Sequence, residues 1–68
     1  MSNDNIPTHE IEQDIADTQN EIDQYQRELD VLMENTQGNK VAIYMRQGMI
    51  SVRKSFIDKL NSILEQRK

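Results

Sequence analysis

The sequence predicts an all-α protein in which two long helices pack as an antiparallel coiled-coil hairpin. Three observations lead to this prediction. Apolar side chains recur every three or four residues in both halves of the chain, a Gly-Asn pair separates the two halves, and the charge changes sign at that pair. Residues 1–38 carry ten acids and one base, whereas residues 39–68 carry seven bases and two acids. Two arms of opposite charge can fold against each other.

Residues 1–7 are expected to form a disordered tail, because this segment is terminal and largely polar. A helix is expected to begin at Thr8, directly after Pro7, since a threonine hydroxyl can accept hydrogen bonds from the free backbone N–H groups of a first turn. Glu10 and Glu12 follow at once, where the positive end of the helix dipole favours acidic side chains. The folded part is therefore predicted to start at residue 8.

The first helix is expected to span residues 8–37, which contain neither glycine nor proline. Its apolar and small side chains alternate at spacings of four and three residues, which is the pattern of a coiled-coil seam. The seam positions are Ile11, Ile15, Thr18, Ile22, Tyr25, Leu29, Leu32 and Thr36. A seam this narrow covers only one edge of the helix, so the helix needs a partner to be stable.

Gly38 and Asn39 are expected to form the turn between the helices. Glycine suits the left-handed residue that closes a helix, and asparagine suits the cap of the next one. A link this short forces an antiparallel hairpin. The competing interpretation is one continuous helix in which Gly38 is tolerated. The hairpin is favoured because the glycine, the asparagine and the change of charge coincide.

The second helix is expected over residues 40–66 and has a wider apolar face. Two columns repeat every seven residues, one made of Ala42, Met49, Phe56 and Ile63 and the other of Ile43, Ile50, Ile57 and Leu64. The narrow seam of the first helix cannot cover so wide a face, so we expect the second column to stay partly uncovered within one hairpin. A homodimeric four-helix bundle is the simplest way to bury it. The alternative is that supercoiling covers the column inside a single hairpin.

The candidate interface combines this column with its neighbours on the second helix. Its members are Ile43, Arg46, Ile50, Arg53, Phe56, Ile57, Leu60 and Leu64. Arg46 and Arg53 fall between the apolar columns, where charged side chains are seldom buried unless paired. With a turn at Gly38 they lie near Asp30 and Asp23, so interhelical ion pairs are the favoured interpretation. An anion site at an interface and charged docking of a partner are the alternatives.

No pattern in the sequence indicates catalysis, a metal site or a bound cofactor. The chain has no cysteine, and His9 is its single histidine. It contains no glycine-rich phosphate loop, nucleophile motif or zinc spacing. The many carboxylates of the first helix are interpreted as a solvated face that also pairs with the basic helix, since carboxylates in acid–base catalysis need a pocket. We therefore expect a protein that is not an enzyme and that binds no cofactor or metal.

Composition favours a cytoplasmic protein without a membrane segment. The longest apolar run, residues 41–45, is far too short to span a bilayer, and the polar N-terminus lacks the apolar run of a signal peptide. The absence of cysteine fits the cytosol. The 68 residues form one domain at most, and a domain this small is marginal unless it oligomerises or binds a partner.

These observations predict a non-catalytic protein–protein interaction module, such as a small assembly factor, adaptor or regulator. Its expected partners are itself, as a homodimer, and an unidentified second protein. One alternative is a small acidic inhibitor that docks on a basic nucleic-acid-binding protein. The other is a nucleic-acid-binding module that uses the basic second helix. This last function is disfavoured because the net charge is −4 and the acidic helix would repel phosphates.

Overall fold

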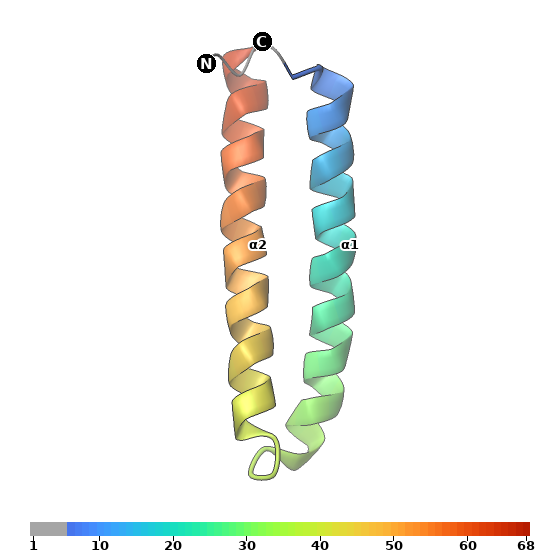
Figure 1. The fold of residues 1–68 in the computed structure, drawn as a ribbon, viewed down its shortest axis with the longest axis vertical. Coiled ribbons are helices and arrows are strands. Elements are labelled where there is room, and N and C mark those ends of the chain that lie inside the picture. Colours follow the sequence, from blue (N-terminus) through green and yellow to red (C-terminus); the bar gives the residue numbers. More distant parts are fainter. Residues whose placement is uncertain (1–5) are drawn as a thin grey trace.

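The computed structural model describes residues 6–68, so residues 1–5 of the tail expected over 1–7 lie outside the described residues. Two α-helices, α1 (Thr8–Leu32) and α2 (Lys40–Gln66), are joined by the 3₁₀ helix η2 (Met33–Asn35) and by the four residues that follow it. The helices run antiparallel, with the start of α1 and the end of α2 at one end of the molecule and the turn at the other (Figure 1).

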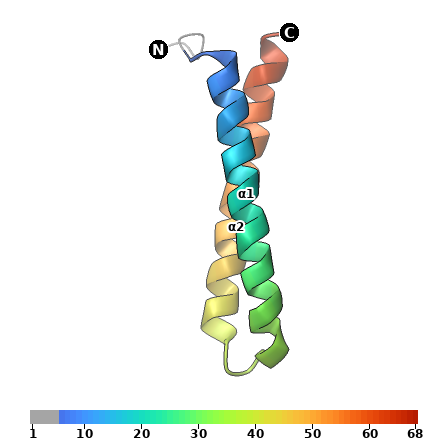
Figure 2. The ribbon, with the colours of Figure 1, turned by 90° about the vertical axis from the view of Figure 1, so that its right-hand side faces the viewer.

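The molecule is a rod. Its principal extents are 47 × 18 × 16 Å and its Cα radius of gyration is 15.3 Å, whereas a compact domain of this length has a radius of about 11 Å. The two helices pack against each other and cross at a shallow angle in the view from the side (Figure 2), as coiled-coil packing requires. The prediction of two packed helices is thus confirmed for the described residues.

Helix α1 packs through the seam that its sequence predicts. Four seam side chains are buried, namely Ile11, Thr18, Ile22 and Leu29. Three others are half-buried, namely Ile15, Tyr25 and Leu32. Thr36, the last predicted member, is exposed because it lies in the turn and not in the helix. The spacing of apolar residues therefore predicts the inward face of α1 along the whole helix.

Helix α2 meets α1 through a seam of its own, with alternating spacings of three and four residues. Its positions are Ile43, Arg46, Ile50, Arg53, Ile57, Leu60, Leu64 and Arg67, and all are buried or half-buried. The central cluster is formed by Ile22, Leu29, Ile43 and Ile50, against which Tyr25, Leu32 and Ile57 pack. Each large aliphatic side chain buried there contributes ~1.5–3 kcal/mol, so these layers hold the two helices together.

The turn is longer than expected, because α1 ends at Leu32 and not five residues later. Two asparagines hold it. Oδ1 of Asn35 accepts a hydrogen bond from the backbone N–H of Gly38 at 3.3 Å, and Nδ2 of Asn39 donates to the carbonyl of Leu32 at 3.1 Å. Side-chain partners of this kind satisfy backbone groups at a helix end. They allow α1 to stop early without leaving those groups unpaired.

Gly38 and Asn39 act differently from the sequence expectation. Gly38 does not adopt the left-handed backbone conformation. A Cβ atom at this position would lie 2.9 Å from Nδ2 of Asn35, so a larger residue would require this exposed side chain to shift. Asn39 occupies the N-cap position of α2, but its side chain forms no cap hydrogen bond to that helix. The side chain instead serves the C-terminal end of α1.

At the opposite end of the rod, Arg67 joins the two helices. Its Nη1 donates to the carbonyl of Ile6 at 2.7 Å and to the hydroxyl of Thr8 at 3.1 Å. Thr8 therefore takes part in an interhelical contact. The N-cap position expected for it is occupied by Pro7, whose carbonyl accepts a hydrogen bond from the N–H of Glu10 at 3.0 Å. Both ends of the rod are thus closed by hydrogen bonds between the helices or across the turn.

Candidate interaction surface

Most of the predicted interface lies inside the hairpin. Its five aliphatic members belong to the α2 seam and face α1, namely Ile43, Ile50, Ile57, Leu60 and Leu64. Ile43 and Ile50 are only 7% and 6% exposed. The expectation that this column stays partly uncovered is therefore wrong for Ile43 and Ile50, whereas Ile57 and Leu64 remain half-buried. Arg46 and Arg53 line the edge of the same seam, and Phe56, which is 44% exposed, is the one predicted member that lies outside it.

The column that begins at Ile43 faces α1 because of how α2 is rotated about its own axis. Arg46, Arg53 and Arg67 alternate with the aliphatic layers of the seam, so α2 turns these three side chains toward α1. The aliphatic stem of an arginine can pack on apolar surface while its guanidinium reaches the edge. With the arginines placed in this way, the column that begins at Ile43 is covered by α1. The column that begins at Ala42 therefore lies outside the seam with α1.

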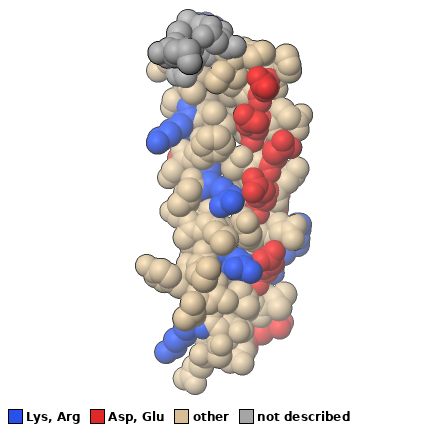
Figure 3. Space-filling view, in the orientation of Figure 1, with Lys and Arg blue, Asp and Glu red and all other residues tan. Residues whose placement is uncertain are grey.

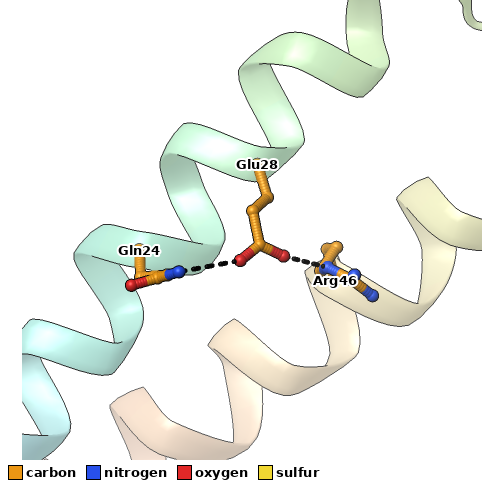
Figure 4. Close-up of polar contacts among 3 residues, drawn as sticks. All are labelled: Gln24, Glu28 and Arg46. Carbon is orange, nitrogen blue, oxygen red and sulfur yellow. Dashed lines mark hydrogen bonds and ion pairs between the residues drawn. The ribbon is translucent and has the colours of Figure 1, made fainter.

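Arg46 pairs with Glu28 at the edge of the seam (Figure 4). Nε of Arg46 lies 2.7 Å from Oε1 of Glu28, and Nε2 of Gln24 donates to Oε2 of the same carboxylate at 3.3 Å. The Arg46 hydrogen bond, and then that of Gln24, hold the pKa of Glu28 below its usual value of 4.5 because they stabilise the charged form. The Arg46 and Glu28 side chains are 30% and 35% exposed, so water screens this ion pair in part.

Arg53 repeats this arrangement two turns along α2. Its Nε lies 3.4 Å from Oε2 of Glu21, and its Nη1 donates to the carbonyl of Met49 at 3.2 Å. Its guanidinium carbon stands 4.9 Å from the centroid of the Tyr25 ring, a geometry in which a cation and an aromatic face attract each other. Three different groups therefore fix this side chain at the junction of the two helices.

The arginine partners differ from those expected. Asp23 and Asp30 each follow a buried seam residue of α1, and each accepts a hydrogen bond from a glutamine one turn earlier in the same helix. Glu21 and Glu28 each precede a buried seam residue and stand at the edge nearest the arginines. Interhelical ion pairs of Arg46 and Arg53 do form, but the predicted partners are wrong, because Glu28 and Glu21 take the places expected for Asp30 and Asp23.

A second apolar stripe of α2 is left outside the hairpin, and we call it the outer stripe. Its members are Ala42, Met45, Met49, Val52, Phe56 and Ile63. They are spaced three, four, three, four and seven residues apart, and Lys59 takes the one intervening heptad position. Met45 and Val52 are 50% and 68% exposed. The outer stripe therefore has the pattern of a coiled-coil seam but lacks a helix to cover it within the hairpin.

Across the arginines from the outer stripe, α1 carries a row of carboxylates that we call the acidic row. It consists of Glu10, Asp14, Asp17, Glu21 and Glu28. Figure 3 shows acidic side chains running down α1 on one face of the rod, with basic side chains beside them over α2. Glu21 and Glu28 are paired with the arginines, whereas no ion pair among residues 6–68 involves the other three. This face thus carries carboxylates along α1 and basic side chains beside them along α2 (Figure 3).

The apolar surface widens toward the turn. Four large side chains are exposed there, namely Val31, Met33, Val41 and Tyr44. Two shallow depressions lie on either side of Arg46. The first is lined by Glu28, Val31, Leu32 and Arg46, and the second by Tyr44, Met45, Gly48, Met49, Val52 and Arg53. Val41 and Tyr44 are 74% and 78% exposed, so they add apolar surface near the turn.

Within residues 6–68, no three His, Cys, Asp or Glu side chains come close enough together to hold a metal ion. Neither of the described helices is long and apolar enough to cross a membrane. No protein-family model, curated protein or solved structure matched the chain. The outer stripe and the acidic row are therefore the features on which a functional argument can be built.

Proposed function

We propose that this chain is a non-catalytic protein–protein interaction module, acting in the cytoplasm as a small assembly factor, adaptor or regulator. The observation that carries the proposal is the outer stripe, whose apolar side chains follow heptad spacing and yet are exposed or only half-buried in the hairpin. Apolar side chains gathered on the surface of a folded domain mark interaction sites. The absence of cysteine supports a reducing compartment.

The hairpin has a core that does not include the outer stripe. The central cluster is built from α1 and the Ile43 column alone. A side chain such as Val52, which is 68% exposed, adds little to that core. Holding the two helices together therefore does not require the outer stripe. Docking of another helix explains why these exposed positions are apolar.

Self-association is a second candidate, because a second copy can cover the same outer stripe. Two-fold dimers are the commonest oligomers, and a pair of hairpins would form the four-helix bundle that the sequence predicts. The contact would then use Met45, Val52 and Phe56. It would not use the column that begins at Ile43, since α1 already covers that column.

Docking of the acidic row on a basic protein is a narrower form of the same proposal. The three carboxylates outside the ion pairs, Glu10, Asp14 and Asp17, favour it. Direct nucleic-acid binding has less support, because Arg46 and Arg53 are paired with carboxylates of α1 and Arg67 contacts its first turn. Basic side chains engaged in this way are poorly placed to bind phosphates.

Site-specific photo-crosslinking tests the proposal. A benzophenone amino acid is placed at Val52 in the outer stripe or, as the matched control, at Gln47, an exposed residue roughly opposite on α2. We expect crosslinking in cells to join position 52 to one discrete protein species, either a second copy or another protein, with a much lower yield from position 47. Equal yields from both positions, or no product from either, would contradict the proposal.

A further inference from the structure

We propose that the outer stripe and the acidic row together bind an amphipathic α-helix of another protein, one with an apolar heptad seam and a flank rich in Lys or Arg. The bound helix lies along the junction of α1 and α2 and completes a three-helix bundle. This inference rests on the proposed function and specifies the partner that the surface fits.

The spacing of the outer stripe indicates that a helix covers it. Residues at alternating spacings of three and four face a second helix in coiled-coil packing. Ala42 and Phe56 are 14 positions apart, which is roughly 21 Å along the helix, and the stripe as far as Ile63 extends over roughly 32 Å. Gly48 borders the stripe with open space where a Cβ atom would stand, so a partner backbone can approach closely. Met45 and Met49 provide side chains that adapt to different partners.

The acidic row determines the charge of the partner. Arg46 and Arg53, which follow Met45 and Val52 of the outer stripe, pair with Glu28 and Glu21 of the acidic row. A helix seated on the outer stripe therefore has one flank toward α1 and its acidic row. Arg53 and Arg46 neutralise Glu21 and Glu28, while Glu10, Asp14 and Asp17 carry no ion pair within residues 6–68. Lysine or arginine on that flank would meet these carboxylates, and complementary charge gives both orientation and faster association.

A second copy of the chain does not supply this charge. The outer stripe lies roughly a quarter turn around α2 from the seam that holds α1, at ~103° per residue in a coiled coil. An antiparallel two-fold pair of α2 helices would place both α1 helices on one side, with acidic row against acidic row. A parallel two-fold pair would place Lys59 against its own copy within the stripe. Like charges repel in both arrangements.

Two synthetic peptides test this inference on the full chain. Both are three-heptad helices with leucine along one seam, and they differ only in carrying lysine or glutamate at the flanking positions. We expect the lysine peptide to bind by isothermal titration at least ~10-fold more tightly than the glutamate peptide at low salt. The difference should shrink as the salt concentration rises, because the charges are exposed.

Variants then locate the site. Val52→Asp in the outer stripe should abolish binding of the lysine peptide, whereas Gln47→Asp, roughly opposite on α2, should leave it unchanged. The double variant Asp14→Lys/Asp17→Lys leaves the outer stripe intact and should reverse the preference, so that the glutamate peptide binds better. Circular dichroism confirms that each variant keeps its helices. If both peptides bind equally, or if the double variant keeps the lysine preference, the inference is wrong.

Failure of this inference is distinguishable from failure of the proposed function. If position 52 crosslinks to a second copy, and Val52→Asp converts a dimer into a monomer, the stripe is a homodimer interface. That result overturns the basic-helix partner and leaves the interaction module standing. If no lysine peptide binds and position 52 yields no specific crosslink, both the inference and the proposed function are overturned.

Discussion

At the scale of single residues, the arginines of the α2 seam decide how the hairpin is put together. Arg46 and Arg53 occupy positions that aliphatic residues usually fill, and each contacts a glutamate of α1. A charged pair at the edge of a seam contributes less than an apolar layer, but it specifies alignment because a shifted helix would leave both charges unpaired. The pairs therefore fix which residues of α1 and α2 lie side by side.

The lowered pKa of Glu28 makes the stability of the hairpin depend on pH. Arg46 and Gln24 favour the carboxylate in the folded state, so its stabilising contribution is complete above the unfolded pKa and is lost as the pH falls through the lower folded pKa. We expect Glu28→Gln to lower Tm at neutral pH, and the difference from the native chain to close as the pH falls below 4.5 and through the lower folded pKa. Thermal unfolding followed by circular dichroism at a series of pH values measures this.

Glu34→Gln is the control for this experiment, since Glu34 is exposed in η2 and away from the seam. Its Tm should follow that of the native chain at every pH. A gap between Glu28→Gln and the native chain that stays constant down to the lowest pH would show that the Arg46 pair does not stabilise the fold.

Arg53→Glu should destabilise the hairpin more than Lys54→Glu. The first change places a carboxylate beside Glu21 and removes the contact with the Tyr25 ring. It should cost about 1–2 kcal/mol of unfolding free energy. The second change alters an exposed side chain next in sequence, and such surface changes stay within about 0.5 kcal/mol. Urea unfolding of both variants measures the two costs, and equal values would rule out a structural role for Arg53.

At the scale of helices, sequence periodicity predicted α1 well and α2 only in part. The apolar side chains of α1 form a single narrow line from Ile11 to Leu32, so only one face of this helix can pack inward. Helix α2 offers two apolar columns, and counting apolar residues alone does not choose between them. The choice depends on Arg46 and Arg53, whose stems pack in the seam although their charge excludes them from an apolar count. For that reason, sequence reasoning places the partner interface on the column that begins at Ile43, and this column packs against α1 in the structure.

The turn was misplaced for a local reason. Gly38 and Asn39 mark a helix break in the sequence, but the bond from Asn39 to the carbonyl of Leu32 spans seven residues. Asn35, which fixes Gly38, has no distinctive pattern around it. The early end of α1 thus coincides with two side-chain hydrogen bonds, one within the turn and one from Asn39 back to Leu32, which residue spacing does not predict.

The Ile43 column and the outer stripe of α2 should respond differently to truncation. Ile50→Ala removes a side chain from the central cluster and should cost about 2–5 kcal/mol of unfolding free energy. Val52→Ala changes a side chain that is 68% exposed and should cost less than about 0.5 kcal/mol in the free hairpin. Chemical denaturation at low protein concentration compares them. A large cost for Val52→Ala would mean that the outer stripe is buried in solution, most simply by self-association.

At the scale of the whole molecule, the division of charge between the halves serves two purposes. Two acids of α1 attract the arginines of α2 and align the hairpin, and the remaining acids form a negative edge along α1 (Figure 3). Helix α2 carries two seams. One packs against α1, and the other, the outer stripe, is exposed or half-buried. Composition alone predicted that a chain of this size would need a partner, and the structure shows which apolar side chains of α2 stay exposed.

Sedimentation equilibrium of the full chain over a wide range of concentrations, with circular dichroism on the same samples, is the most direct test. The central claim is that the hairpin folds through the seam between α1 and α2 and keeps its outer stripe exposed for a basic helix. The claim predicts a helical species with the mass of one chain at every concentration, and a gain of one peptide mass when the lysine peptide is added. A dimer that Val52→Asp converts to a monomer would contradict the claim, as would a single chain that is not helical.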